Sequence, residues 1–231
     1  PAANAAVTVA RLGGKAAFAG YLGEDYFGDL HFEELCAEGV ITDLVVRGPH
    51  PSPFSVILVK PDGKRTVINH RAATPFLDTS HVDFSRVHPK VILLDGHEPR
   101  ISLPLAKSAG GRNIPTVLDA GSVHAGTIEL APICDYLVGS EAFARDFCLG
   151  KKPMEAAKDL ARLAPVAVIT MGSLGLVWCT GTECGNIPAQ RVDAIDTTGA
   201  GDIFHGAFAL RLARGDDLLS ALRYAGVAAA L

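Results

Sequence analysis

Between residues 91 and 170 the chain alternates short apolar segments with helical stretches, and this alternation restricts the possible folds more than any other feature. The apolar segments have the length of buried strands: Val91–Leu94, Thr116–Leu118, Tyr136–Val138 and Ala167–Thr170. Strands and helices that alternate in this way build a parallel sheet, because a helix carries the chain back to the start of the next strand. We therefore predict an α/β fold, with a mostly parallel central sheet and helices on both faces.

The segments on either side of this alternation add further elements. Helical spacing of apolar residues predicts helices, and Gly39 stands where a left-handed cap would end one of them. The expected helices are Ala2–Leu12, Tyr26–Glu38, Ala200–Arg214 and Asp217–Leu231. The expected strands are Ala16–Tyr21, a hairpin within Leu174–Ile187 and an edge strand at Gln190–Ala194.

The segment from residue 40 to residue 70 has a different, β-rich character. Strands are expected at Leu44–Arg47, Phe54–Lys60 and Arg65–Asn69, with a strong turn at residues 61–63. We interpret this segment as a small antiparallel insert in a single domain that covers residues 1–231. Because the chain starts at Pro1 without a methionine and stops inside an Ala-rich helical run, we expect both ends of the domain to be truncated.

Composition excludes several classes of protein. The net charge is −4 and no run of Lys or Arg forms a basic stripe, so a nucleic-acid partner is not expected. The apolar stretches are far shorter than a membrane span and no signal peptide precedes them, which favours a cytoplasmic enzyme. The five cysteines include no CxxC pair and are expected to be free thiols, although Cys179 and Cys184 flank a turn and could face each other.

The stretch DTTGAGDIF at residues 196–204 follows a strand and opens an apolar helix. Gly199 and Gly201 let the backbone approach a ligand closely, and the N–H groups of the first helical turn form an anion site suited to a phosphate. Asp202 lies beside this site. A carboxylate there is well placed to accept a proton from a hydroxyl group that attacks the phosphate.

A structural role is the commoner one for such residues, with Asp196 or Asp202 capping the helix and the glycines turning the chain. An isolated GxGD stretch would favour that role. The full string, D-T-T-G-A-G-D followed by x-F-x-G-A, instead resembles the second signature of the ribokinase-like (PfkB) carbohydrate kinases. The resemblance implies that Asp202 is the catalytic base and that residues 199–201 (Gly199, Ala200 and Gly201) hold the transferred phosphoryl group.

A second resemblance to this family lies at the other end of the chain. PAANAA at residues 1–6, RLGG at 11–14 and GYLGEDYFG at 20–28 look like its first signature, in which the asparagine contacts sugar hydroxyls. Asn4 inherits that role, although an asparagine near a helix start is more often a cap. The two signatures are in the right order and nearly the whole chain apart. The resemblance therefore covers essentially all residues and implies a three-layer α/β/α sandwich with a small β lid.

Weaker matches suggest the remaining ligand contacts. TMGSLG at residues 170–175 resembles the family's nucleotide loop, which implies that Thr170, Gly172 and Gly175, together with Thr198, contact ATP. DGKRT at residues 62–66 resembles the hairpin of the sugar-covering lid and suggests Arg65 as a sugar contact, although a solvated turn explains those charges too.

The polar strand ends lie where ligands collect in open α/β sheets, at Asp95, Asp119, Gly139 and Thr170. DGHE at residues 95–98 and the Asn4 region resemble the ketohexokinase and sulfofructose kinase branch more than ribokinase itself. His97 is a candidate sugar contact, and a histidine held by its own loop is the alternative.

The chain departs from the family at the N-x-x-E motif near the magnesium ion. Its counterpart reads SEAF at residues 140–143, so Glu141 is the candidate metal ligand, and a magnesium ion held largely through water is the alternative. A monovalent cation such as K⁺ is a further candidate cofactor.

By this resemblance, Asp202 takes the proton of a primary hydroxyl of a small carbohydrate, such as a ketose or sugar acid, as that hydroxyl attacks the γ-phosphoryl group of ATP. The lid would exclude water and pair with a second lid in a homodimer. Alternatives are a nucleoside kinase and a non-catalytic sugar or nucleotide sensor, although a sensor needs no base. A dinucleotide oxidoreductase is disfavoured because no GxGxxG follows a strand with an acidic residue downstream.

Overall fold

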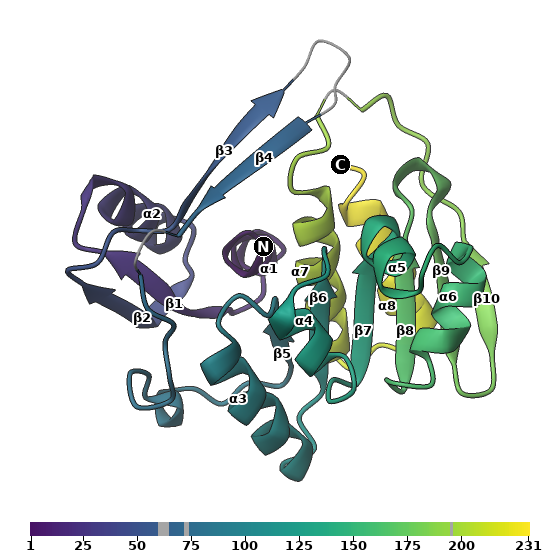
Figure 1. Ribbon diagram of the computed structural model, residues 1–231, viewed down its shortest axis with the longest axis horizontal. Coiled ribbons are helices and arrows are strands. Elements are labelled where there is room, and N and C mark those ends of the chain that lie inside the picture. The colour runs from purple at the N-terminus through teal and green to yellow at the C-terminus, as the bar shows by residue number, and fades with distance from the viewer. Residues whose placement is uncertain (60–64, 72–73, 195) are drawn as a thin grey trace.

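The computed structural model describes residues 1–59, 65–71, 74–194 and 196–231, and at Arg65 the backbone alone. Its centre is a six-stranded sheet in the order β10-β9-β8-β7-β6-β5 (Figure 1). Neighbours from β5 to β8 are parallel, whereas β9 is antiparallel to both β8 and β10. The strands are β5 (Ile92–Leu94), β6 (Thr116–Ala120), β7 (Tyr136–Ser140), β8 (Val166–Thr170), β9 (Leu176–Thr180) and β10 (Cys184–Ile187).

Helices cover both faces of this sheet, which confirms the predicted α/β architecture. One face carries α3 (Pro99–Gly111), α4 (Ala125–Leu130), α5 (Glu141–Phe147) and α6 (Pro153–Leu160). The other face carries α7 (Ala200–Ala213) and α8 (Leu218–Ala228).

Neighbouring residues of each strand supply the two cores. In β6, Val117 packs under α7 and α8, while Leu118 packs under α3 to α6. The same division separates Val138 from Leu137 in β7. Because both faces of the central strands β6 to β9 are buried, these strands are largely apolar and show no alternation in sequence.

The N-terminal part forms a separate layer beside this sandwich. Helix α1 (Ala2–Arg11) packs against α7, and β1 (Ala17–Gly23) pairs in parallel with β2 (Ile41–Gly48) through the crossover helix α2 (Tyr26–Ala37). Strands β3 (Phe54–Val59) and β4 (Arg65–His70) form an antiparallel hairpin that projects away from the body of the molecule (Figure 1). Short 3₁₀ turns lie at Phe84–Arg86 and Gly172–Leu174.

Two strand predictions need correction. The segment Leu44–Arg47 does not belong to an antiparallel insert, because it lies within β2 and pairs in parallel with β1. Leu44 is buried there against Leu77, Val82 and Ile101, so this strand is part of the body of the protein.

The second wrong prediction is the edge strand at Gln190–Ala194, because these residues do not form a strand. These residues are exposed along their whole length, so no buried face holds them in a sheet. Pro188 follows β10 directly and has no N–H group to offer a ladder of hydrogen bonds.

Cysteine pairing also differs from the expectation of free thiols. Cys179 and Cys184 stand opposite each other in the β9–β10 register, with their Cα atoms 4.1 Å apart, and are joined in a disulfide. The tight hairpin brings the two thiols together, which composition alone does not indicate. Cys36, Cys134 and Cys148 are free, and burial raises the pKa of the Cys134 thiol to about 12.

No helix within the described ranges has both the length and the apolar character needed to cross a membrane.

Candidate active site

The start of α7 is the part of the chain that carries the DTTGAGD string. Gly199 precedes the helix with φ +79°, a left-handed conformation that glycine adopts without strain. One carboxylate oxygen of Asp196 accepts from the Thr198 backbone N–H at 2.8 Å and from its hydroxyl at 2.7 Å. Asp196 therefore shapes the turn, while Asp202 lies on the first turn of the helix, whose N–H groups have no partner within the helix and attract an anion.

Asn4 and Asp202 are 198 residues apart in sequence and meet in space. The Asn4 side-chain amide donates to an Asp202 carboxylate oxygen at 2.6 Å. The Thr8 hydroxyl donates to the Asn4 carbonyl oxygen at 2.9 Å. The structure thus brings together the residue predicted to bind sugar and the residue predicted to act as base.

The close packing of α1 on α7 makes this meeting possible. A Cβ atom at Gly206 would lie 2.5 Å from the carbonyl oxygen of Ala5, so only glycine permits the observed approach. Asn4 is the residue next to Ala5 on α1. The glycine of the x-F-x-G-A string therefore places Asn4 in reach of Asp202.

The loop after β5 borders the same region. Asp95 accepts from the backbone N–H of Ala2 at 3.3 Å and from that of His97 at 3.0 Å, which ties this loop to the start of α1. The exposed ring of His97 stacks on His124, with ring centroids 4.9 Å apart. Burial, and then the neighbouring His97, lower the pKa of His124. The His124 ring is held in place, because it caps α4 through the Thr127 backbone and bonds the Asp95 backbone. The exposed His97 imidazole and the Asp95 carboxylate therefore remain as the polar groups nearest to a ligand here.

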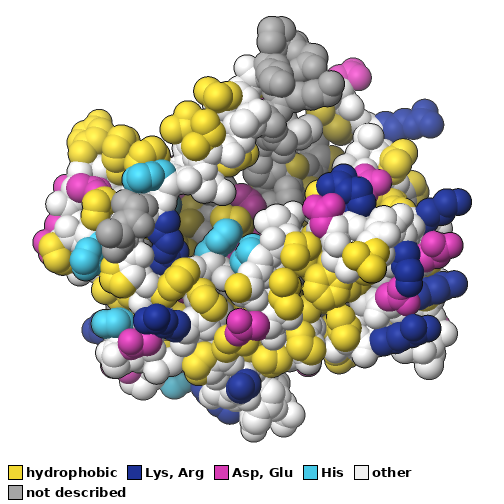
Figure 2. All heavy atoms as spheres, in the orientation of Figure 1, with side chains coloured by type: hydrophobic (Ala, Val, Ile, Leu, Met, Phe, Trp, Pro, Cys, Tyr) yellow, Lys and Arg dark blue, Asp and Glu magenta, His cyan; other side chains and the backbone are white. Residues whose placement is uncertain are grey.

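Arg71 joins the base of the β3–β4 hairpin to this loop. Its guanidinium forms an ion pair with Glu98 at 2.5 Å and donates to the His97 carbonyl oxygen at 3.3 Å. Glu98 also accepts from the backbone N–H of Leu77 at 2.8 Å. Figure 2 shows histidine side chains in the hollow of this face, below the hairpin.

The predicted nucleotide loop follows β8. The φ angles of Gly172 and Gly175 are +56° and +90°, and the Gly175 backbone N–H donates to the Gly172 carbonyl oxygen at 3.0 Å. A Cβ atom at Gly175 would lie 2.1 Å from the Ile187 carbonyl oxygen, so packing alone requires a glycine here, whether or not the loop binds a nucleotide. The Thr170 hydroxyl donates to the Gly139 carbonyl oxygen at 3.3 Å. The loop lies at the carboxyl ends of the strands, the side at which α7 begins (Figure 1).

Glu141, the candidate metal ligand, is the exposed first residue of α5, immediately after β7. Across the part of the chain that the structure describes, no group of three or more His, Cys, Asp and Glu side chains could hold a metal ion. A magnesium ion needs only one or two protein carboxylates when substrate phosphates and water complete its shell, so a single carboxylate fits it. The Arg65 side chain lies outside the described residues.

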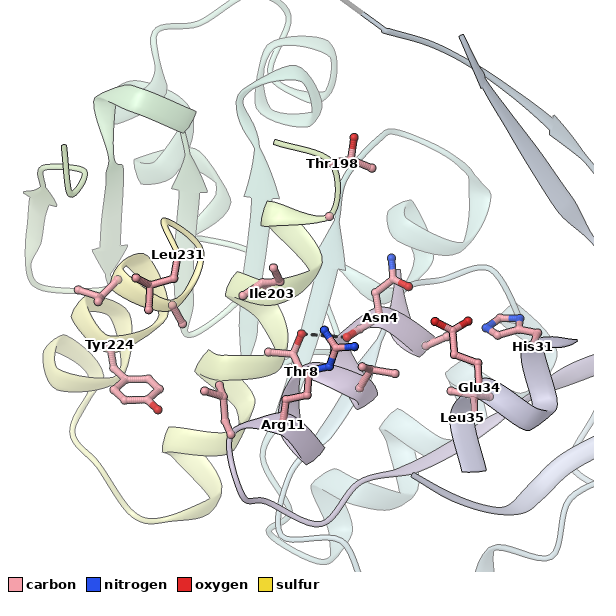
Figure 3. A pocket seen from close by; sticks show the side chains of 16 residues that line it. Asn4, Thr8, Arg11, His31, Glu34, Leu35, Thr198, Ile203, Tyr224 and Leu231 are labelled. Atoms are coloured by element: carbon pink, nitrogen blue, oxygen red, sulfur yellow. Dashed lines mark hydrogen bonds between the residues drawn. The ribbon is translucent and has the colours of Figure 1, made fainter. Parts of the chain in front are cut away.

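A cavity of about 460 Å³ opens beside α1 and reaches the site at one end (Figure 3). Asn4, Thr198 and Gly199 line that end. From there the cavity runs between α1, α2 and α8, past Arg11 and Tyr224. Asn4 on α1 and Thr198 ahead of α7 thus border one hollow.

One residue near the site was missed by sequence reasoning. His205 occupies the variable position of the x-F-x-G-A string, is buried, and lies 3.5 Å from Asp119 at the end of β6. Asp119 was noted only as a polar strand end. Because a single histidine in an apolar helix is usually satisfied in the core, nothing in the sequence singled out His205.

Comparison with known proteins agrees with this geometry. The family model for the pfkB family carbohydrate kinases matches residues 1–231. The ribokinase of Bacillus subtilis is 28% identical over 99% of this chain and 78% of its own length. The fructokinase of Vibrio alginolyticus is 29% identical over 93% of this chain and 76% of its own length.

Solved structures show the same likeness. The structure of Arabidopsis thaliana ribokinase complexed with ribose and ATP superposes with a TM-score of 0.87 at 26% identity, covering 99% of this chain and 79% of that one. Thermotoga maritima ribokinase superposes with a TM-score of 0.84 at 27% identity, over 99% and 78% of the two chains. The chain therefore belongs to the pfkB family of carbohydrate kinases and is an ATP-dependent carbohydrate kinase.

Proposed function

We propose that this kinase transfers the γ-phosphoryl group of ATP to a primary hydroxyl of a small carbohydrate such as a ketose or sugar acid, with Asp202 as the general base. The observation that carries the proposal is the 2.6 Å contact between Asn4 and Asp202 at the start of α7. A sugar hydroxyl that binds at Asn4 lies within reach of the Asp202 carboxylate, and the N–H groups of the helix start are beside both.

The chemistry follows from these positions. Asp202 accepts the hydroxyl proton as the oxygen attacks phosphorus, and the bond from phosphorus to the ADP oxygen breaks. The amides of Gly199, Ala200 and Gly201 stabilise the charge that gathers on the transferred group. Thr170, Gly172, Gly175 and Thr198 form the nucleotide side, and Glu141 is the carboxylate that we assign to Mg²⁺, which neutralises phosphate charge when bound.

The loop after β5 supplies further sugar contacts in this proposal. The exposed His97 offers imidazole nitrogens to hydroxyl or acidic groups of the substrate, and His124 supports its ring by stacking. The relatives include a ribokinase and a fructokinase, so both aldoses and ketoses are substrates to test. A phosphorylation screen with ATP against ketoses, aldoses, sugar acids and nucleosides identifies the acceptor, and preference for a nucleoside would contradict the carbohydrate assignment.

The β3–β4 hairpin acts as a lid and as a dimer contact in this proposal. Both of its faces are apolar and exposed: Val56, Leu58 and Ile68 on one face, Ile57, Val59 and Val67 on the other. Figure 2 shows hydrophobic side chains along the hairpin. A two-stranded ribbon needs further packing to be stable in water, which closure over the sugar and a second copy of the hairpin would supply.

Substitution of the two aspartates tests the role of Asp202. Asp202→Asn keeps the shape of the side chain and removes the proton acceptor, so kcat should fall by about 10²–10⁴-fold while sugar and ATP still bind. Asp196→Asn should lose less activity, because Asp196 supports the turn through Thr198. Near-normal kcat in Asp202→Asn would exclude the proposed mechanism.

A further inference from the structure

Two ionisable side chains lie buried behind the first turn of α7. Asp119, near the end of β6, is 5% exposed, and His205, on the second turn of α7, is 4% exposed. The Nδ1 atom of His205 is 3.5 Å from a carboxylate oxygen of Asp119. The proposed phosphoryl transfer uses neither residue, although both lie next to the first turn of α7, which holds Asp202.

The surroundings of the imidazole determine its protonation. Nδ1 is 2.7 Å from the carbonyl oxygen of Gly201, and Nε2 is 3.2 Å from the carbonyl oxygen of Val138. A carbonyl oxygen only accepts hydrogen bonds, and a neutral imidazole carries one N–H. The neutral ring would therefore direct a lone pair at one of the two carbonyls, whereas the imidazolium donates to both. Asp119 supplies the negative charge that a buried imidazolium requires.

We propose that His205 is held as an imidazolium by Asp119 and the two carbonyl oxygens, and that it is the residue that positions the first turn of α7 for phosphoryl transfer. The Gly201 carbonyl and the Asp202 N–H belong to the same planar peptide group and point in opposite directions. When His205 holds that carbonyl from behind, it aims the Asp202 N–H at the anion site.

The positive charge of His205 also compensates the negative charge of Asp119. The pKa of Asp119 is raised above its ordinary value, chiefly by burial and further by the carboxylates of Asp202 and Asp95, and the positive charge of His205 opposes this rise. Without the imidazolium, Asp119 would be either a protonated acid or an uncompensated charge behind a site that binds phosphate. The imidazolium removes that repulsion.

The charge state of His205 can be measured without any catalytic assay. Side-chain ¹H–¹⁵N NMR of the purified protein at neutral pH, with His205→Gln to assign the signal, should show both ring nitrogens protonated. In Asp119→Asn the same ring should lose one proton. A neutral His205 ring in the wild-type protein would overturn the proposal.

The effect on catalysis rests on the proposed function and is measured separately. His205→Gln keeps one donor but removes the charge, so kcat should fall on the order of 10- to 100-fold, as when reacting groups are misplaced, with smaller changes in KM. Asp119→Asn should act in the same direction, and the double variant should lose no more than the worse single variant.

Arg211→Gln is the matched control, because Arg211 pairs with Asp216 at 2.5 Å near the far end of the same helix. It should lower the melting temperature and leave kcat unchanged. A kcat for His205→Gln equal to that of Arg211→Gln would refute the positioning role. If Asp202→Asn stayed active while His205 proved to be an imidazolium, the base assignment would fail and the charge assignment would stand.

Discussion

Gly206→Ala is the substitution for which the structure sets the clearest expectation. The new Cβ atom would lie 2.5 Å from the Ala5 carbonyl oxygen and 3.0 Å from the Thr8 Cβ atom. An ordinary contact begins at 3.4 Å, so α1 and α7 must separate by about 0.9 Å. Over-packing of this kind costs about 1–3 kcal/mol of unfolding free energy, and a domain of this size loses about 2–4 °C in Tm per kcal/mol.

The same displacement reaches the active site. Asn4 adjoins Ala5, and a shift of about 0.9 Å would lengthen its 2.6 Å bond to Asp202 to about 3.5 Å, beyond hydrogen-bond length. We therefore expect kcat/KM for the sugar to fall by about 10²-fold, the loss that a misplacement near 1 Å can cause. Steady-state kinetics with saturating ATP, together with thermal unfolding, measures both effects.

Gly226→Ala provides the control. Gly226 lies in α8 with nothing within 4 Å of its Cβ position, so alanine should stabilise the helix by about 0.5–1 kcal/mol and leave the kinetics unchanged. If Gly206→Ala behaved like Gly226→Ala in both assays, the α1–α7 contact would not control the position of Asn4.

The remaining predictions concern sugar binding and assembly. Asn4→Ala should raise the KM for sugar well before that for ATP, since only the sugar contacts Asn4 in the proposed site; a selective loss of ATP affinity would reverse the assignment of the two sides. Sedimentation should detect a dimer. Polar substitution of a cross-strand pair should weaken it when that pair lies on the face of the lid that the partner covers. The two pairs to substitute, one on each face, are Ile57 with Val67 and Val56 with Ile68. A wild-type monomer, or a dimer that survives both double substitutions, would contradict pairing through the lid.

The core of the fold could be predicted because its pattern is local. Each buried strand is a short apolar run and each helix carries its own spacing, so the strands β5 to β8 and the helices α1, α2, α7 and α8 were predicted to within a few residues. The pairing of β2 could not be found in the same way. Its sequence is β-rich like the hairpin that follows, and only the crossover helix α2 indicated a parallel partner.

In the candidate site, too, residues that are close in sequence could be predicted, and contacts between distant residues could not. Asp196, Gly199 and Asp202 belong to one contiguous string, so the glycine turn and the helix start could be predicted together. His205 lies in that string too, yet its partners Asp119 and Val138 are distant in sequence. A histidine alone does not reveal a buried carboxylate that only the folded sheet brings within 3.5 Å.

The two signature strings are brought together by one close helix contact and one turn, and each of them depends on a glycine. Gly206 lets α1 approach α7, and Gly199 turns the chain so that α7 begins beside α1. The Asn4 amide donates to Asp202 and thereby fixes the orientation of that carboxylate. In the proposed mechanism, a sugar hydroxyl that replaces this donor meets a carboxylate that is already oriented. The free-energy cost of orienting the base is then met during folding and does not recur in each catalytic cycle.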